Sequence, residues 1–296
     1  DWARLYERRE RYVIGTVPEG PIVLTAGVDV QKDRFVYEVV GWDALKGSTS
    51  IEAGELLGDT ALDSTWNKLD ELLARVYPGA DGRVFTISKL AIDSGYNTQM
   101  VYAWARARGH ALVMACKGVP GPRAIVGAAT AVDVTVRGRR IQHGHRMWPI
   151  GVDVAKGELY GWLRLEHHDE GDPPTGWCRF PEYDQEFFKQ LTAEHLMKIV
   201  NRRTGRSRLE WQPFPNRENH YLDARILARA AAVVLGIDRM ASAARATATA
   251  APPAAVQPGA HPATAPSSAA QSEARPRRLS NLLGKARGNY WGKKRP

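Results

Sequence analysis

Three aspartates occupy positions from which their carboxylates could act together. Asp29 and Asp93 each end a strongly apolar run, in AGVDVQ and LAIDSG, and Asp223 lies in NHYLDARILARAA, near the start of a helical pattern. In open α/β sheets, ligands bind in the crevice at the carboxyl ends of the strands. Hard cations such as Mg²⁺ take carboxylate oxygens and water as ligands. The three carboxylates are therefore candidate ligands of divalent metal ions.

This combination suits phosphodiester hydrolysis. Two divalent ions about 4 Å apart can activate the attacking water and neutralise the charge on the leaving oxygen. Asp29, on what we predict to be the central strand, would bridge the two ions. Each aspartate alone also has a plain structural interpretation, because strand-end aspartates cap turns and a helix N-terminus favours the negative charge of Asp223. The order of strand, strand and helix favours the joint interpretation.

Two further side chains are accessory candidates. His220 lies three residues before Asp223, on the same predicted helical face, and could act as another ligand or orient a water molecule. Lys117 follows an apolar run in ACKG and could contact a scissile phosphate, although a solvated loop lysine is the alternative interpretation. A basic loop adds cations that could follow a nucleic-acid backbone or could form a plain basic turn. These loop candidates are Arg202, Arg203, Arg206 and Arg208.

Other polar residues are less suited to catalysis. Asp153 ends the apolar run WPIGVDVAKG and rivals the three aspartates, but a capping role is favoured. Asp33, in QKDR, is predicted to be a turn residue. Two histidine pairs lack a matching cysteine or a third histidine, so we interpret them as loop residues rather than as a metal site. These pairs are His143 with His145 and His167 with His168.

Hydrophobic patterning predicts a mixed α/β fold that would position these residues. Continuous or alternating apolar runs predict three antiparallel strands, followed by further strands and helices in alternation. A helical period is clearest in the segment that contains Asp223. The predicted strands cover residues 22–30, 34–42, 50–57, 84–93 and 110–116; the predicted helices cover 62–77, 97–108 and 218–237; a hairpin joins 194–200 to 208–211.

Composition excludes several classes of protein. With 44% hydrophobic and 25% charged residues, the 296-residue chain is neither collagen-like, nor wholly disordered, nor a coiled coil. Its two cysteines, Cys116 and Cys178, exclude a disulfide scaffold and are expected to be reduced thiols. No apolar run reaches the roughly 20 residues of a membrane span, so we expect no association with a membrane.

Charge and composition divide the chain into three parts. Residues 1–20 are predicted to be an N-terminal linker segment, residues 21–240 the folded domain, and residues 241–296 an Ala/Pro-rich flexible linker with a basic, disordered tail. The net charge of the whole chain is +9. Residues 241–296 hold nine Lys and Arg against one Glu, a net charge of +8, which leaves +1 for residues 1–240. The basic character therefore describes the tail, which is either solvated or docks on a partner or on phosphate.

Five segments in order resemble the C-terminal nuclease domain of the large terminase subunit of lambda-like phages. They are LTAGVDVQKDR, LAIDSGYNT, WPIGVDVAKGELYG, FPEYDQEFFKQLTAE and NHYLDARILARAA. The resemblance implies a ribonuclease-H-like α/β fold, with a mixed sheet of three antiparallel strands followed by parallel strands and flanked by helices. It implies that Asp29, Asp93 and Asp223 are catalytic and bind two Mg²⁺ or Mn²⁺ ions, with no other cofactor.

The same resemblance implies a metal-dependent endonuclease that cleaves concatemeric double-stranded viral DNA during genome packaging. Its implied partners are the portal protein, the small terminase subunit and a terminase ATPase domain, in the cytoplasm of the host bacterium. The chain has no G-x-x-x-x-G-K-[ST] phosphate loop, so we expect no ATP hydrolysis from it. Alternatives are a resolvase- or transposase-type nuclease of the same fold, and a non-catalytic packaging adaptor that docks the portal through its basic tail.

Overall fold

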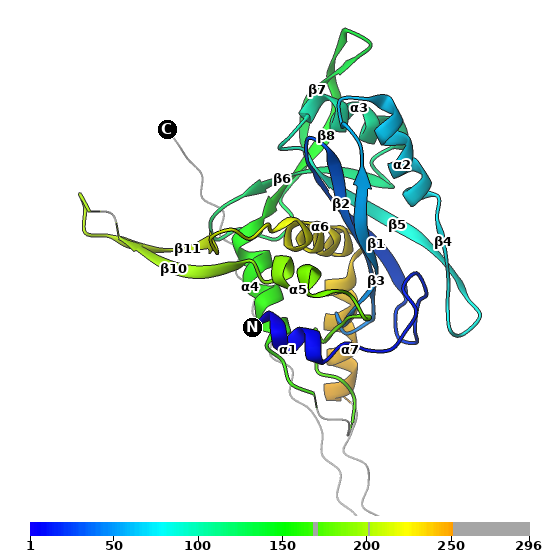
Figure 1. Cartoon of the computed structure of the whole chain (residues 1–296), viewed down its shortest axis with the longest axis vertical. Helices are drawn as coiled ribbons and strands as arrows, with labels where there is room; N and C mark the ends of the chain where they lie inside the picture. Colours follow the sequence, from blue (N-terminus) through cyan, green and yellow to red (C-terminus); the bar gives the residue numbers. More distant parts are fainter. Residues whose placement is uncertain (168–170, 201, 251–296) are drawn as a thin grey trace, which may run out of the picture. The chain divides into compact units, whose positions relative to one another are not determined.

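A mixed β-sheet forms the centre of the structure (Figure 1). The computed structural model describes residues 1–167, 171–200 and 202–250. In this part of the chain the sheet has nine strands, eight of them in the order β7–β8–β6–β5–β1–β2–β3–β9, with β4 paired to β5. The predicted tail beyond residue 250 lies outside the described residues.

The first three strands form an antiparallel meander, as the apolar runs predict. They are β1 (Val23–Val30), β2 (Arg34–Trp42) and β3 (Ser48–Leu57). Parallel strands then extend the sheet from the other side of β1, in the order β5 (Val84–Asp93) and β6 (Val113–Val119). This arrangement confirms the ribonuclease-H-like mixed sheet and brings the carboxyl ends of β1, β5 and β6 to one edge.

The sheet is completed by strands that lie outside the predicted strand ranges. β8 runs parallel to β6, β7 pairs with β8 in antiparallel orientation, and β9 runs parallel to β3 at the opposite edge. Their bounds are Thr130–Val136 for β7, Arg139–Gly151 for β8 and Cys178–Arg179 for β9.

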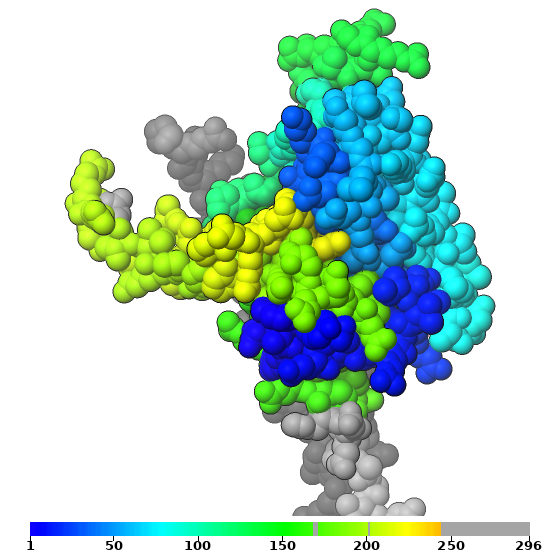
Figure 2. All heavy atoms as spheres, viewed as in Figure 1, coloured from blue at the N-terminus to red at the C-terminus, as the bar shows by residue number. Residues whose placement is uncertain are grey.

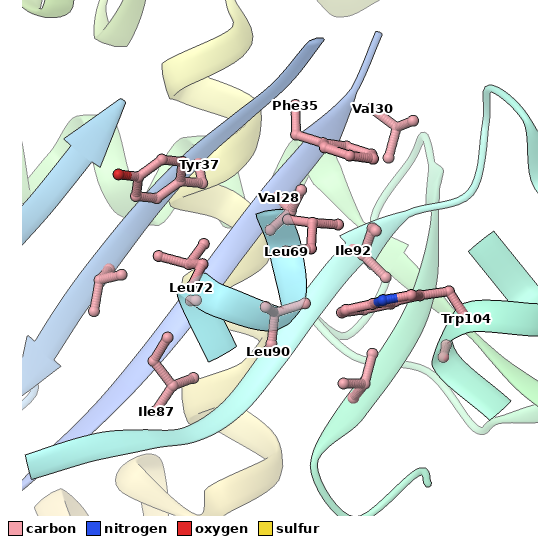
Figure 3. Close-up of a cluster of buried hydrophobic side chains, with 14 of the residues drawn as sticks. Val28, Val30, Phe35, Tyr37, Leu69, Leu72, Ile87, Leu90, Ile92 and Trp104 are labelled. Atoms are coloured by element: carbon pink, nitrogen blue, oxygen red, sulfur yellow. The ribbon is translucent and has the colours of Figure 1, made fainter. Parts of the chain in front are cut away.

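Helices cover both faces of the sheet. On one face, α2 (Asp63–Leu73) and α3 (Thr98–Arg108) pack on alternate residues of β1, β2 and β5, and Figure 3 shows Leu69 and Leu72 of α2 among these side chains. The opposite face carries α4 (Val152–Leu163), α5 (Gln185–Leu191) and α6 (His220–Leu235). No helix in the described residues is long and apolar enough to cross a membrane.

The predicted helix over residues 62–77 extends four residues too far at its C-terminal end. Helix α2 ends at Leu73, and Val76–Pro78 forms the short strand β4, which pairs with β5. A residue before proline is disfavoured in the helical region, which favours the extended conformation of Tyr77 ahead of Pro78. In the strand, Tyr77 is 1% exposed, so pairing buries an aromatic side chain that an extended helix would not have placed there.

The strand predicted over 110–116 begins and ends three residues later. Helix α3 stops at Gly109, which has φ +80°, and the N–H of Val113 then donates to the carbonyl of Gly109. This turn occupies 110–112 and delays the strand. As a result Lys117 lies inside β6, opposite Pro149 of β8, and not in a loop.

The segments on either side of the predicted domain contain helices where linkers were expected. Helix α1 (Trp2–Glu7) packs on α5, and its Leu5 is 2% exposed. The segment 1–20, predicted as a linker, is therefore packed against the folded domain through α1. Helix α7 (Ile237–Ala250) follows α6 after Gly236, so residues 241–250 are helical where composition predicts the start of a linker.

The predicted basic hairpin is present as a separate two-stranded sheet. Strand β10 (Glu194–Val200) pairs with β11 (Ser207–Pro213) in antiparallel register. Figures 1 and 2 show the hairpin projecting from the body, and Figure 1 shows α4 beside its base. Most of its side chains are exposed, and only its base, at Glu194, is buried.

Candidate active site

The three predicted aspartates line one cavity. It has a volume of about 170 Å³ and lies where the ends of β1 and β5 meet the first turn of α6. The remaining wall comes from residues of β6, β8, α4 and α6, namely Gly118, Ile150, Val152, Ile226 and Leu227. Residues separated by up to 198 positions in the sequence therefore share one small, partly apolar space.

Strand alternation explains why Asp29 faces α6. Successive side chains of a strand point to opposite faces, so Thr25, Gly27 and Asp29 share one face of β1. Thr25 Oγ1 donates to the carbonyl of Ala228, and Asp29 Oδ2 lies 2.7 Å from His220 Nδ1. Between them, an added Cβ on Gly27 would lie 1.8 Å from the carbonyl oxygen of Ala224. The missing side chain of Gly27 thus lets α6 lie directly on β1.

Asp29 is 6% exposed and is held by two polar neighbours. Its Oδ2 accepts a hydrogen bond of 2.8 Å from Gln31 Nε2 and shares the 2.7 Å contact with His220. The bond to Asp29 raises the pKa of His220, and the Asp29 charge adds to the effect. His220, an accessory candidate from its spacing, thus contacts Asp29 directly. Gln31 was not among the predicted site residues.

Asp93 ends β5 and turns its carboxylate toward the same cavity. Its Oδ2 accepts the backbone N–H of Gly95 at 2.9 Å. Burial raises the pKa of Asp93 above its usual value and the charge of Asp29 contributes, while Lys117 acts in the opposite direction. Asp93 pairs in register with Cys116, the residue before Lys117. Lys117 is exposed and directly precedes the cavity-lining Gly118 in β6.

Asp223 has the most strongly shifted carboxyl of the three. Burial raises its pKa to about 7, and repulsion from Asp29, Glu194 and Asp93 adds to that shift. Lys156 of α4 is the cation that opposes it. A cluster of carboxylates in a desolvated space is unfavourable unless positive charge joins it. The cavity therefore favours a cation electrostatically.

The donor set fits a hard divalent cation, but the carboxylates do not converge as a finished ligand cage. Three aspartates supply the oxygen ligands that Mg²⁺ and Mn²⁺ prefer. Among the residues that the structure describes, no group of three or more His, Cys, Asp or Glu side chains is close enough to hold an ion as it stands. Binding would require the carboxylates to draw together, which the mutual repulsion noted for Asp223 opposes until a cation enters.

The competing polar residues lie elsewhere. Asp153, in the first turn of α4, accepts the backbone N–H of Gly121 at 2.6 Å and fixes that loop to the helix. Asp33 is exposed in the β1–β2 turn beside Arg34. His143 and His145 lie in β8, so their assignment to a loop was wrong; the 13-residue strand continues through both. His145 is 7% exposed and packs between Tyr102 and Trp148.

The other histidine pair and the basic loop are only partly described. His167 packs against Trp177, with ring centroids 5.5 Å apart, and His168 lies outside the described residues. Arg208 of β11 pairs with Glu210. The remaining predicted loop cations, Arg202, Arg203 and Arg206, are exposed at the far end of the hairpin.

Two charged residues that sequence reasoning missed adjoin the site. Lys156 and Glu194 form a buried ion pair, with Nζ 2.7 and 2.8 Å from the two carboxylate oxygens, and Glu194 also accepts from Asn219. They lie 38 positions apart in the sequence, and the residues around each of them show no unusual clustering of charge. No local spacing or composition signal identifies such a pair.

Comparisons with known proteins agree with this geometry. Two curated relatives are named "Terminase, large subunit": that of Enterobacteria phage P21 is 29% identical over 231 residues, and that of Escherichia phage lambda is 31% identical over 232 residues. The matches cover 77% and 76% of this chain but 34% of each relative, so the chain spans about a third of their length. No solved structure matches.

A family model supplies the broadest match. The model of the endonuclease domain of the terminase large subunit gpA matches residues 1–242, which include all three aspartates of the cavity and the whole hairpin. This chain therefore belongs to the gpA endonuclease-domain family of terminase large subunits.

Proposed function

We propose that the protein is a two-metal-ion endonuclease that cleaves concatemeric double-stranded viral DNA during genome packaging. The observation that carries the proposal is the meeting of Asp29, Asp93 and Asp223 around one cavity at the carboxyl edge of a ribonuclease-H-like sheet. Membership of a terminase endonuclease family supports the same reaction. The three carboxylates repel one another across a small buried space, and a bound cation would relieve that repulsion.

In this proposal each residue has a separate task. Asp29, Asp93 and Asp223 would hold two Mg²⁺ or Mn²⁺ ions, with Asp29, at the centre of the sheet, as a ligand common to both. When bound, such ions supply Lewis-acid activation of water and neutralise the leaving oxygen. His220 fixes the orientation of the Asp29 carboxylate through the 2.7 Å contact. Lys117, whose side chain is exposed, binds the phosphate next to the bond that is cut.

DNA would also contact the hairpin. The cations Arg202, Arg203, Arg206 and Arg208 would bind phosphates, which positions a duplex without selecting a sequence. Residues 1–240 have a net charge of only +1, so DNA binding by this part alone should be weak. We therefore also propose that portal protein, a small terminase subunit and a terminase ATPase domain hold the enzyme on its substrate in the cytoplasm of the host bacterium.

The direct test compares metal-dependent plasmid cleavage by the wild type and by Asp29→Ala. We expect the wild type to cut with Mg²⁺ or Mn²⁺ and to be inactive with EDTA. Asp29→Ala should lose roughly 10²–10³-fold in rate, because removing one charge-stabilising group commonly costs that much. Asp33→Ala is the matched control, because this aspartate is exposed in the adjacent turn.

The alternatives give different results in the same assay. A resolvase-type enzyme would prefer a four-way junction to linear duplex, and a transposase-type enzyme would join strands. A packaging adaptor would cut neither substrate with either metal. Cleavage by Asp29→Ala at the wild-type rate would exclude the proposed site.

A further inference from the structure

A buried ion pair connects the helix α4 to the base of the hairpin. Lys156 is 8% exposed and Glu194 is 5% exposed, and the lysine Nζ reaches both carboxylate oxygens. A buried pair of this kind adds little net stability compared with apolar side chains of the same volume, because both ions lose their hydration. Stability alone therefore does not account for two charges at this place, beside the acidic cavity.

Glu194 is the residue at which three elements meet. It is the first residue of β10, and its backbone N–H donates to the hydroxyl of Tyr160 on α4 at 3.1 Å. Its Oε1 also accepts a 2.9 Å hydrogen bond from Asn219 Nδ2. Asn219 is the N-cap residue of α6, yet its side chain makes no capping hydrogen bond to that helix. The start of α6 is thus tied to a hairpin residue through the Asn219 side chain.

The first turn of α6 carries the site residues. The N–H of Asp223 donates to the carbonyl of Asn219 at 3.0 Å, and His220, next in the chain, contacts Asp29. A movement of Asn219 would therefore change where the Asp223 carboxylate lies relative to Asp29. A binding site must be held within about 0.5 Å of its productive geometry, so such a movement would change the affinity of the cavity for a cation.

The hairpin is attached to α4 through its second strand as well. Trp211 Nε1 of β11 donates to the carbonyl of Asp153 at 3.3 Å, and the Trp211 ring packs against Tyr160 with centroids 4.8 Å apart. Figure 1 shows both strands leaving the body at this place, with their far end extending away from it. A movement of the hairpin on binding DNA would therefore change the contacts at its base, where Glu194 lies.

We propose that Lys156 and Glu194 are positioning residues that link the cation affinity of the Asp29–Asp93–Asp223 cavity to DNA bound along the hairpin. The proposal rests on the proposed function, since it needs both ligands. Glu194 neutralises the charge of Lys156, which would otherwise compete with the metal ion for Asp223. Glu194 also holds Asn219 in place by a hydrogen bond. Coupling of this kind is reciprocal, so DNA raises the affinity for the cation and the cation raises the affinity for DNA by the same factor.

The test is calorimetric titration of the full chain with Mn²⁺, with and without a saturating short DNA duplex. For the wild type we expect the duplex to tighten Mn²⁺ binding about fivefold or more. Glu194→Gln should bind Mn²⁺ more weakly and lose this gain. The double variant Lys156→Met/Glu194→Leu replaces the pair with apolar side chains; it should fold and also lose the gain. Lys156→Arg keeps the positive charge and should retain the tightening of Mn²⁺ binding by the duplex.

Lys89→Met is the matched control. Lys89 is another buried lysine, 5% exposed, but its Nζ bonds only the carbonyls of His110 and Ala111, away from the hairpin. Its loss should lower the melting temperature and leave the DNA-dependent gain in Mn²⁺ affinity unchanged. A change in this control equal to that in Glu194→Gln would mean that the effect is general destabilisation, which overturns the proposal.

Two other results overturn the proposal. One is a wild type whose Mn²⁺ affinity is the same with and without the duplex. The other is a folded Glu194→Gln or double variant that keeps the wild-type gain. Cleavage is assayed in parallel, so a wild type that binds Mn²⁺ with DNA linkage but does not cut would refute the proposed endonuclease without affecting this inference.

Discussion

At the residue scale, the surroundings of Asp223 make its carboxyl difficult to ionise. Its pKa of about 7 reflects burial first and repulsion from neighbouring carboxylates second. An unfolded aspartate has a pKa near 3.9, so the unfolded chain releases this proton at lower pH than the folded protein does. Asp223 therefore makes its full contribution to the free energy of unfolding below about pH 4. That contribution is lost as the pH rises through about 7.

The difference between the folded and unfolded pKa of Asp223 predicts that the metal-free protein becomes less stable as the pH rises. In EDTA, the wild type should lose roughly 2–4 kcal/mol of unfolding free energy between pH 4 and pH 8 through Asp223. Asp223→Asn cannot ionise and should escape that loss, so its melting temperature at pH 8 should exceed that of the wild type by several degrees. Mn²⁺ should then stabilise only the wild type. Thermal melts at both pH values measure this, with Asp33→Asn as control.

At the scale of elements, the contact between β1 and α6 sets the geometry of the site. Thr25, Gly27 and Asp29 meet successive turns of α6, and the absent side chain at Gly27 allows backbone to approach backbone. The buried pair of Glu38 on β2 and Arg225 on α6, with oxygens and nitrogens 2.6 and 2.8 Å apart, ties the same helix to the next strand. The helix that supplies Asp223 is thus fixed to the strand that supplies Asp29.

Gly27→Ala should therefore displace α6 without altering any charged residue. Overpacking of this kind typically costs about 1–3 kcal/mol, and a clash with backbone lies at the upper end. We expect a lower melting temperature together with weaker Mn²⁺ binding and slower cleavage. Gly15→Ala provides a comparison, since an added Cβ there meets nothing within 4 Å, although its φ of +83° brings its own backbone strain. Wild-type Mn²⁺ affinity in a folded Gly27→Ala protein would argue against this role.

At the scale of the whole molecule, charge is distributed unevenly along the chain. Residues 1–240 are almost neutral, while residues 251–296 hold eight of the nine cations counted beyond residue 240. Non-specific affinity for DNA falls with salt in proportion to the number of phosphates that cations neutralise. The long-range attraction of this chain to DNA should therefore come mostly from its last 46 residues.

Truncation after Ala250 tests this distribution, because the described helix α7 ends there. The truncated protein should bind DNA more weakly at low salt, and the slope of log affinity against log salt concentration should become less steep by several units. Metal-dependent cleavage at saturating DNA should persist, since every cavity residue is retained. An unchanged salt slope would show that the hairpin and body supply the phosphate contacts instead.

The sequence alone determined the features that depend on local pattern. Alternating and continuous apolar runs predicted β1, β2, β3 and β5, and the ends of two of those strands identified Asp29 and Asp93. A helical period identified the segment of α6 with His220 and Asp223. Such signals are readable because strand and helix periodicities extend over only a few neighbouring residues.

Only the tertiary structure decided the features that depend on contacts between distant segments. Strand β4 replaced the end of a predicted helix because pairing with β5 buries Tyr77. The ion pair of Lys156 and Glu194 forms because α4 and the hairpin are folded together, and neither residue differs in type or spacing from an exposed one. Burial and charge pairing are properties of three-dimensional packing, so a residue's neighbours in the chain do not reveal them.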